Sequence, residues 1–524
     1  MKTRWICALL VILAAFGHAA GTEDQAAMPD PVEVSIMTVE NYYAPAPYSN
    51  GLAIIEAYRE MAEHRLGYPI VFDFITYTWA NYDEQKEIVL ASGSDLPWFI
   101  WNVQDHQKWG EAGVLVDLLP LIEEHAPNMR AEMAQRPILK AVPMTPDGKM
   151  YGYAMVSPPQ YINGGGVNIR KDWLDKLGLE PPTTSMDLLE AVRAFRANDV
   201  NGDGEQNELL ISVNRSQHLT MGAWYGLQLW RSGGFQADSD GVVSYAWISP
   251  RAKEYLQMMQ DLYTEGVLDP DFMQMNTEKF VARMNSNLAG ATIGYMGTAA
   301  SYNETYDPAP GAELISLPVL IGPHGDQFME LAPGVDIPTS ISRDADPVAA
   351  IIIYDTARSP EGGVNNLWGI EGETWVWGED GKRTWADKLI NNPDGLSTGQ
   401  AFSAMGGRRN FLRGHSYDSW EAQWSSDRFA PMRAARPFHR VDIPFTEGLQ
   451  TDLEDISVVS RYMPDIQTYV DENVAKFMIG EQSMDKWDEF VATVKELGID
   501  HIIAVRQKQA DRFIDIVGDR YPWR

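Results

Sequence analysis

The hydrophobic pattern at the start of the chain alternates between strand-like and helix-like segments. Short runs of β-branched and aromatic residues predict strands over residues 32–39, 70–75 and 98–101. Apolar positions at helical spacing predict helices over residues 54–66 and 83–91. Strands that alternate with helices in this way indicate an α/β fold with mostly parallel sheets.

The same alternation continues farther along the chain. Residues 185–197 predict a helix with one apolar face and with Ser185 as its N-cap. Residues 290–297 predict a strand that contains glycines, and residues 347–358 predict a helix that begins at a proline. From about residue 449 onward the pattern is mostly helical.

One segment interrupts the alternation. The prolines at 158 and 159 are followed closely by the glycines at 164–166. Such runs favour turns and crossings over helices and strands. We therefore expect the chain to pass from one lobe to another at this point.

Composition and charge narrow the classes of protein that fit. The chain has 524 residues, of which 45% are hydrophobic and 22% charged, so it can form a large core and is not disordered. Its 73 acidic residues outnumber its 42 lysines and arginines, which gives a formal charge of −31. This charge argues against nucleic acid or an anionic membrane as the main partner.

The N-terminus has the pattern of a secretory signal peptide. Lys2 and Arg4 form a positive region, residues 6–16 are apolar, and residues 17–20 are mostly small. The apolar stretch is too short to span a bilayer. We expect residues 1–19 to be removed, and the alternative interpretation is a buried N-terminal helix.

The single cysteine helps to predict the location of the protein. Cys7 lies inside the apolar region, too early to carry the lipid of a bacterial lipoprotein. A secreted chain of this size without disulfides indicates a bacterial periplasm. We therefore expect a periplasmic protein that is not a lipoprotein.

A polar loop at residues 199–208 (DVNGDGEQNE) is the most specific local motif. Calcium prefers six to eight hard oxygen ligands, which alternating residues of a tight loop can supply. The candidate ligands are the side chains of Asp199, Asn201, Asp203, Asn207 and Glu208 and the main-chain carbonyl of Glu205.

The loop also departs from the EF-hand pattern. Its twelfth position is Leu210 instead of glutamate, and the residues that follow predict a strand instead of a helix. The sequence therefore predicts a structural Ca²⁺ site of helix–loop–strand form. A polar turn without a metal is the alternative interpretation.

Further short motifs recur in a fixed order along the chain. They are residues 90–97 (LASGSDLP), 113–128 (GVLVDLLPLIEEHAPN), 147–152 (DGKMYG), 169–174 (IRKDWL), the loop at 199–208, 262–266 (LYTEG), 359–362 (SPEG), 369–373 (GIEGE), 380–382 (DGK) and 469–480, followed by Trp487. In this order they resemble the bacterial extracellular solute-binding proteins of ABC sugar importers, in the branch that contains the alginate-oligosaccharide-binding proteins. The similarity extends over nearly the whole chain after the signal peptide.

This resemblance implies an α/β, two-lobed periplasmic-binding-protein fold with a mostly helical C-terminal part. Residues 31–160 with about 305–345 would form the first lobe, and residues 165–300 with about 350–524 the second. The ligand would lie in the cleft between them, and the loop at 199–208 would bind calcium. Unlike many relatives the chain has no lipid-bearing cysteine, and Trp98 stands where an aspartate is usual.

Sugar-binding sites combine aromatic faces with polar side chains that bind hydroxyl groups. From the aromatic clusters we expect Trp79, Tyr295, Glu371 and Trp375 to contact the ligand. For each tryptophan taken singly, a position in the core is the alternative that we favour.

Residues 405–440 carry a local excess of arginines. Arginine binds carboxylates in a bidentate manner, so the stretch can serve a uronate-bearing oligosaccharide. Surface arginines paired with this acidic protein are the alternative that we favour. The ligand class is therefore an oligosaccharide, with an acidic sugar as one option.

The sequence favours a binding protein over an enzyme. It contains no zinc-protease, nucleophile-elbow, phosphate-loop or dinucleotide-binding motif. A secreted polysaccharide-active lyase or glycosidase is the alternative function, and service to a sensor instead of an importer is another. The expected partners are an oligosaccharide and a membrane permease, with the protein itself a monomer.

Overall fold

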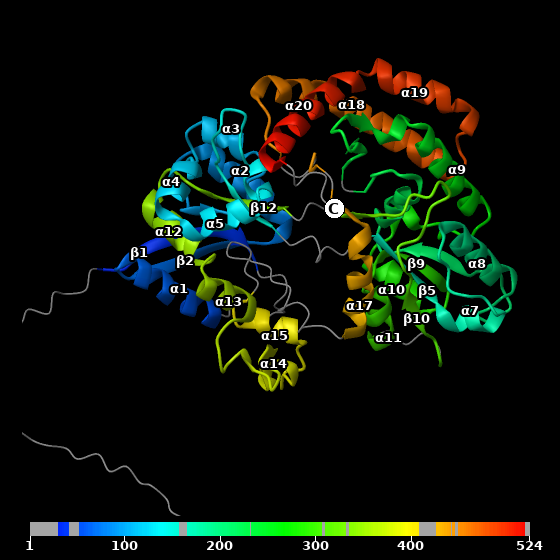
Figure 1. The fold of residues 1–524 in the computed structure, drawn as a ribbon, viewed down its shortest axis with the longest axis horizontal. Coiled ribbons are helices and arrows are strands. Elements are labelled where there is room, and N and C mark those ends of the chain that lie inside the picture. Colours follow the sequence, from blue (N-terminus) through cyan, green and yellow to red (C-terminus); the bar gives the residue numbers. More distant parts are fainter. Residues whose placement is uncertain are drawn as a thin grey trace, which may run out of the picture.

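The computed structural model describes residues 30–40, 52–156, 165–230, 232–305, 310–331, 335–407, 426–441, 443–445 and 449–518. Two β-sheets surrounded by helices form two halves, and the C-terminal helices arch over both (Figure 1). The predicted two-lobed α/β architecture is confirmed. The predicted signal peptide, residues 1–19, lies outside the described residues.

The first sheet is built mainly from the N-terminal part of the chain. Its strands, in spatial order, are β2 (Ile70–Tyr77), β1 (Val32–Val39), β3 (Phe99–Ile100), β12 (Val335–Ile341) and β4 (Tyr153–Val156). β1 pairs in parallel with β2 over its whole length and with β3. β12 returns from much later in the chain and is antiparallel to β3 and β4.

The second sheet begins directly after the first crossing of the chain. Its strands, in spatial order, are β10 (Leu314–Ser316), β5 (Gly165–Arg170), β9 (Ala289–Tyr295) and β6 (Leu209–Ser212). β5 is antiparallel to β10 and β9, whereas β6 is parallel to β9.

The sheets contain fewer parallel pairs than the sequence predicted. In the described parts of the two sheets, three strand pairs are parallel and four are antiparallel. All four antiparallel pairs involve β5 or β12, the strands that the chain enters directly after passing between the halves. The direction of these strands is set by pairing with strands far away in the chain, which the local pattern does not reveal.

Helices pack around both sheets. The first half contains α1 (Ala53–Leu66), α2 (Trp79–Ser92), α3 (His106–Glu111), α4 (Leu118–His125), α5 (Pro127–Gln135), α6 (Ile138–Ala141) and α12 (Pro347–Thr356). The second half contains α7 (Lys171–Leu177), α8 (Ser185–Ala197), η3 (Gln217–Tyr225), η4 (Ala246–Ile248), α9 (Pro250–Thr264), η5 (Phe272–Gln274), α10 (Thr277–Asn285), α11 (Thr298–Thr305) and α17 (Ser426–Ala435). Within the described residues, no helix has an apolar stretch long enough to cross a membrane.

Smaller elements complete the molecule. The pairs β7 (Phe235–Ala237) with β8 (Val243–Tyr245), and β11 (Met329–Leu331) with β15 (His439–Val441), form short two-stranded sheets, and η7 (Arg436–Phe438) precedes β15. A small unit over residues 360–404 consists of α13 (Pro360–Trp368), β13 (Trp375–Trp377), β14 (Arg383–Trp385), α14 (Asp387–Ile390) and α15 (Thr398–Ala404). The C-terminal helices are α18 (Leu453–Met478), η8 (Met484–Lys486), α19 (Trp487–Glu496) and α20 (Ile499–Val517).

The chain divides between the halves differently from the predicted lobes. β10 lies within the segment 305–345 that was assigned to the first lobe, yet it pairs with β5 in the second sheet. α12 lies largely within the segment assigned to the second lobe, yet it packs against α1, α4 and α5. Long-range pairing and helix packing decide these assignments, and neither leaves a local signal.

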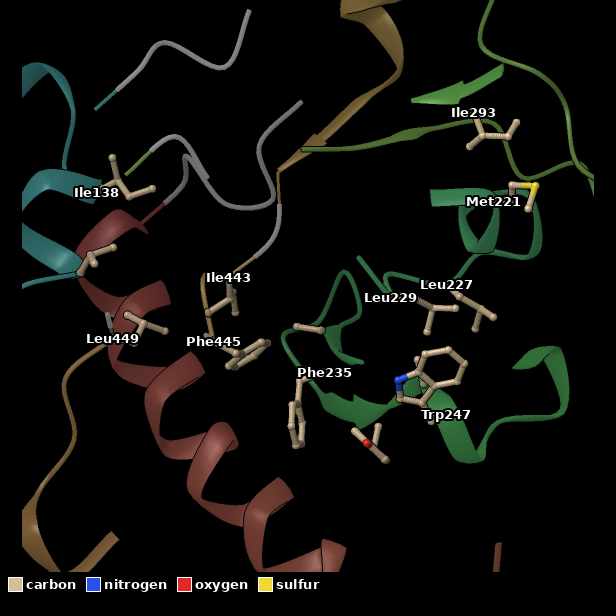
Figure 2. Close-up of a cluster of buried hydrophobic side chains, with 14 of the residues drawn as sticks. Ile138, Met221, Leu227, Leu229, Phe235, Trp247, Ile293, Ile443, Phe445 and Leu449 are labelled. Carbon is tan, nitrogen blue, oxygen red and sulfur yellow. The ribbon is translucent and has the colours of Figure 1, made fainter. Parts of the chain in front are cut away.

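A continuous cluster of buried apolar side chains connects both halves to the C-terminal helices. Helix α20 packs against α6 of the first half and against β7 and β8 of the second, while α18 packs against α9. Figure 2 shows part of this cluster, where Phe235 and Phe445 lie beside α20 with their ring centroids 6.3 Å apart. The halves are therefore joined by a shared core as well as by the crossing segments.

A buried carboxylate fastens three helices of the first half together. The side chain of Asp355 on α12 is fully buried. Its oxygens accept hydrogen bonds from Arg65 Nη2 at 2.8 Å, from Asn128 Nδ2 at 2.7 Å and from the Met129 main-chain N–H at 2.7 Å. The Asp355 carboxylate on α12 is therefore hydrogen-bonded to both α1 and α5, and it holds the three helices together.

We expect Asp355→Ala to destabilise the protein by about 3–5 kcal/mol, because it leaves buried donors without an acceptor. Glu265→Ala is the control, since Glu265 also binds an arginine, Arg193, but at the surface. That exposed pair contributes about 0–1 kcal/mol. Thermal and denaturant unfolding measure both values, and equal effects would contradict a structural role for Asp355.

Candidate functional site

Trp79 lies at the edge of the first sheet where the parallel strands end. It is the first residue of α2, directly after β2, and its side chain is 46% exposed. Its ring meets the buried ring of Trp101 edge-on at 5.4 Å, and Trp101 follows β3. In α/β proteins ligands bind outside the carboxyl ends of such strands. Trp79 therefore presents an exposed aromatic ring at the edge of the sheet where a ligand is expected to bind.

The residues behind Trp79 hold this edge together. The Tyr82 hydroxyl donates hydrogen bonds to the main-chain oxygens of Met37, at 3.2 Å, and Trp101. The buried Lys86 ammonium donates to the main-chain oxygen of Asn102 at 2.6 Å. These hydrogen bonds connect α2 to the ends of β1 and β3, and they therefore fix the position of the helix that carries Trp79.

Tyr295 lies at the corresponding end of β9 in the second sheet. It pairs with Gly165, the first residue of β5 after the crossing. The buried Asn168 amide donates to the Tyr295 main-chain oxygen at 3.1 Å, and the Ser316 hydroxyl donates to Asn168 Oδ1 at 2.7 Å. Three strands of the second sheet thus fix the position of this half-buried tyrosine.

Glu371 and Trp375 belong to the small unit over residues 360–404. The Trp375 side chain is only 3% exposed and packs with Trp368, Trp385 and Phe402. It presents no open face to a ligand in this structure. Glu371 is exposed, and its Oε1 accepts a hydrogen bond from Trp377 Nε1 at 3.1 Å.

From the aromatic cluster at this point of the sequence, the prediction selected Trp375 instead of its neighbour Trp377. Its side chain is 55% exposed, although it stands only two residues from the buried Trp375. The sequence Trp-Val-Trp gives no means of telling which ring is covered. The four predicted residues therefore occupy three parts of the fold: the first sheet, the second sheet and the small unit.

Much of the predicted arginine stretch lies outside the described residues, which omit 408–425. Arg440 is described, and it has structural partners. Its Nη2 donates to the main-chain oxygen of Ala237 at 3.1 Å, and its guanidinium lies 5.2 Å from the Phe328 ring centroid.

The polar loop at 199–208 follows α8 and leads into β6, which confirms the predicted strand after the loop. α8 spans the predicted residues 185–197, but its N-cap is Thr184 instead of the predicted Ser185, because Thr184 and Asp187 form its capping box. Asp199 adopts a φ of 46°, in the left-handed region. Its Oδ1 accepts hydrogen bonds from the main-chain N–H groups of Gly202 and Asp203, both at 3.1 Å, and its Oδ2 accepts from Gly204 at 3.0 Å.

The other polar side chains of the loop point toward each other. Asn207 Nδ2 donates to Asp203 Oδ2 at 2.8 Å, and this bond is the main reason that the pKa of Asp203 is lowered. Asn201 Nδ2 donates to Asn207 Oδ1 at 2.9 Å. The buried Glu208 carboxylate accepts from the main-chain N–H groups of Asn201 and Asn207, both at 3.2 Å.

The predicted calcium ligands are thus brought together, but as a hydrogen-bonded loop. Among the described residues, no group of three or more His, Cys, Asp or Glu side chains is arranged to hold a metal ion. The loop's donor set instead mixes three carboxylates with two carboxamides. Such a set of hard oxygens fits Ca²⁺ once the amide donors turn away.

The sequence profile of the bacterial extracellular solute-binding proteins matches residues 38–347, more than half of the chain. The chain belongs to this family. A curated relative is the fructooligosaccharide ABC transporter substrate-binding protein FusA of Streptococcus pneumoniae. It is 24% identical over 475 residues, which cover 83% of this chain and 84% of FusA.

Solved structures of this family share the fold. The alginate-binding protein AlgQ2, in its crystal structure without calcium ion, has a TM-score of 0.71 at 22% identity and covers 92% of this chain and 99% of its own. FusA of S. pneumoniae in complex with kestose has a TM-score of 0.69 at 20% identity, with the same coverage. An EF-hand mutant of FusA has also been solved, with a TM-score of 0.70.

These comparisons confirm the predicted family and the role of a solute-binding component of an ABC transporter. The relatives are binding proteins, not enzymes, which agrees with the prediction that this chain is not an enzyme. The family is extracellular, in line with the predicted location outside the cytoplasm.

Proposed function

We propose that the protein binds an oligosaccharide between its two halves and delivers it to the permease of an ABC importer. The observation that carries this proposal is the exposed, well-supported ring of Trp79 at the carboxyl edge of the first sheet, in a chain of the solute-binding family. The faces of pyranose and furanose rings carry C–H groups that pack on an aromatic face, while their hydroxyl groups need hydrogen-bond partners. Relatives named for fructooligosaccharide and alginate support an oligosaccharide as the ligand class.

Binding would close the two halves over the sugar. A ligand shifts a conformational equilibrium only by its differential affinity for the two states. Trp79 on the first sheet and Tyr295 on the second would supply that difference by contacting one ligand from both sides. We further propose a periplasmic monomer whose signal peptide, residues 1–19, is cleaved and which carries no lipid.

We also propose that the loop at 199–208 binds Ca²⁺ for structural reasons. Asp199, Asn201, Asp203, Asn207 and Glu208 would ligate through side chains and Glu205 through its main-chain carbonyl. When bound, the cation supplies charge neutralisation for three carboxylates that share one short loop. The structures of AlgQ2 described as without calcium ion and of the FusA EF-hand mutant support calcium in relatives.

Trp79→Ala should weaken oligosaccharide binding about tenfold, or about 1.4 kcal/mol, because it removes a stacking face. Trp79→Phe should keep part of the affinity. Ile88→Ala is the matched control, since Ile88 is an exposed apolar residue on the same helix. Calorimetry with a panel of neutral and acidic oligosaccharides measures the affinities. Equal losses for Trp79→Ala and Ile88→Ala would contradict a ligand-contacting role for Trp79.

Closure predicts that the wild-type protein becomes more compact when the oligosaccharide is bound. Small-angle scattering with and without a sugar of demonstrated affinity measures the change. The absence of any compaction would exclude the hinge mechanism while leaving binding itself intact. The appearance of new reducing ends or unsaturated products in the same samples would favour the enzyme alternative.

Chelation should lower the melting temperature of calcium-loaded protein, because binding to the folded state alone stabilises it by about 2.7 kcal/mol at a hundredfold excess over Kd. Asp203→Asn should remove most of this difference. Asp380→Asn is the matched control, since Asp380 and Asp203 each accept a hydrogen bond from the main-chain N–H two residues later. A melting temperature that is the same with and without chelator would argue against a metal in the loop.

A further inference from the structure

The hairpin of β13 and β14 presents one tryptophan to solvent and buries its neighbours. Its register pairs Trp375 with Trp385 and Trp377 with Arg383. The turn is closed by the Gly378 main-chain N–H, which donates to the Lys382 oxygen at 2.7 Å. Because Trp375 and Trp385 are packed into the core of the small unit, the hairpin fixes the backbone positions of Trp377 and Arg383.

The ring of Trp377 is exposed but held in place. Its indole N–H is engaged by Glu371, and its ring stands edge-on to Trp375 with the centroids 5.3 Å apart. More than half of its side chain remains open to solvent. A large aromatic ring that is both oriented and uncovered is a pre-organised contact surface, since little side-chain freedom is lost when a ligand packs on it.

Arg383 lies beside this ring without an anionic partner. Its guanidinium carbon is 5.1 Å from the Trp377 ring centroid and 5.0 Å from that of Trp375. It forms no ion pair with another described residue, and its Nε is buried without a hydrogen-bond partner. Other arginines of this strongly acidic chain, such as Arg170 and Arg283, are paired with carboxylates.

The chemistry of this pair indicates what it can bind. A guanidinium that packs through its face against aromatic rings keeps its N–H groups free for a carboxylate, which it binds as a planar fork. A pyranose ring packs on an exposed indole face. A sugar that carries a carboxylate, a uronate, is the ligand that uses both features at once.

We propose that Trp377 and Arg383 form a uronate-binding subsite on the small unit, with Glu371 as a positioning residue that orients the Trp377 ring. The inference rests on the proposed function, because the uronate is one residue of the oligosaccharide that the protein binds. The subsite is separate from the Trp79 edge, which lies on the first sheet. Figure 1 shows the helices of the small unit, α13, α14 and α15, grouped below that sheet.

The test compares a uronate trisaccharide with a neutral trisaccharide by calorimetry on the full-length protein at two salt concentrations. Arg383→Gln should weaken uronate binding about tenfold and remove its salt dependence, while the affinity for the neutral sugar stays unchanged. Trp377→Ala should weaken uronate binding to a similar degree. Arg193→Gln is the matched control, because Arg193 is a half-exposed arginine paired with Glu265 elsewhere on the surface.

Two further variants separate recognition from folding. Arg383→Lys keeps the charge but loses the planar fork, so it should recover only part of the uronate affinity. Glu371→Ala should weaken uronate binding because it removes the acceptor that orients the Trp377 ring, and Glu371→Gln, which keeps an accepting oxygen, should restore most of that loss. Melting temperatures of all variants show whether the hairpin remains folded. We expect Trp377→Ala to stay folded, because the Trp377 side chain is exposed and lies outside the buried core of the small unit.

Several results overturn the inference. Unchanged uronate affinity in Arg383→Gln and Trp377→Ala would refute the subsite while leaving the proposed function standing. Equal losses for the neutral and the acidic sugar would refute the acidic specificity. A wild-type protein that binds the neutral trisaccharide but not the uronate would refute this inference alone. A wild-type protein that binds no oligosaccharide would refute the proposed function and the subsite with it.

Discussion

The packing of α20 against both halves is the contact on which the arrangement of the molecule depends. One face of this helix meets α6 in the first half, and the same helix covers β7 and β8 in the second. The buried apolar cluster therefore continues from one half to the other instead of ending at two separate cores (Figure 2). Any movement of the halves has to slide or repack this layer, because close-packed side chains do not deform gradually.

Polar groups then set the position of individual elements within that apolar frame. Asp355 draws three helices of the first half onto one carboxylate, and Asn168 links three strands of the second sheet at the end that carries Tyr295. Both side chains are fully buried, and each has several hydrogen-bond partners. Satisfied polar groups of this kind fix a register that apolar packing alone would leave less certain. The aromatic residues at the sheet edges depend on this precision, since Trp79 and Tyr295 are placed by the strands behind them.

Charged side chains in the described segments also have specific partners. The carboxylates of the loop at 199–208 are held by main-chain and amide donors, and arginines such as Arg170 and Arg283 are paired with acids. Arg383 differs from these two arginines because it lies beside two tryptophan rings and forms no ion pair with another described residue. In an acidic protein that repels anions at long range, recognition of an acidic sugar has to be local, and screening by salt makes such a short-range site effective.

The sequence by itself determined the local elements and the family. The strands near residues 32–39 and 70–75, the helix before the loop at 199–208 and the strand after it all appear as predicted, because propensity and periodicity act over a few neighbouring residues. Only the tertiary structure decided that β10 joins the second sheet, that α12 packs in the first half, and that Trp375 is buried while Trp377 is exposed. Strand partners and burial are set by contacts between residues far apart in the chain. Two tryptophans in the same strand can therefore carry the same local signal and still face a core and the solvent.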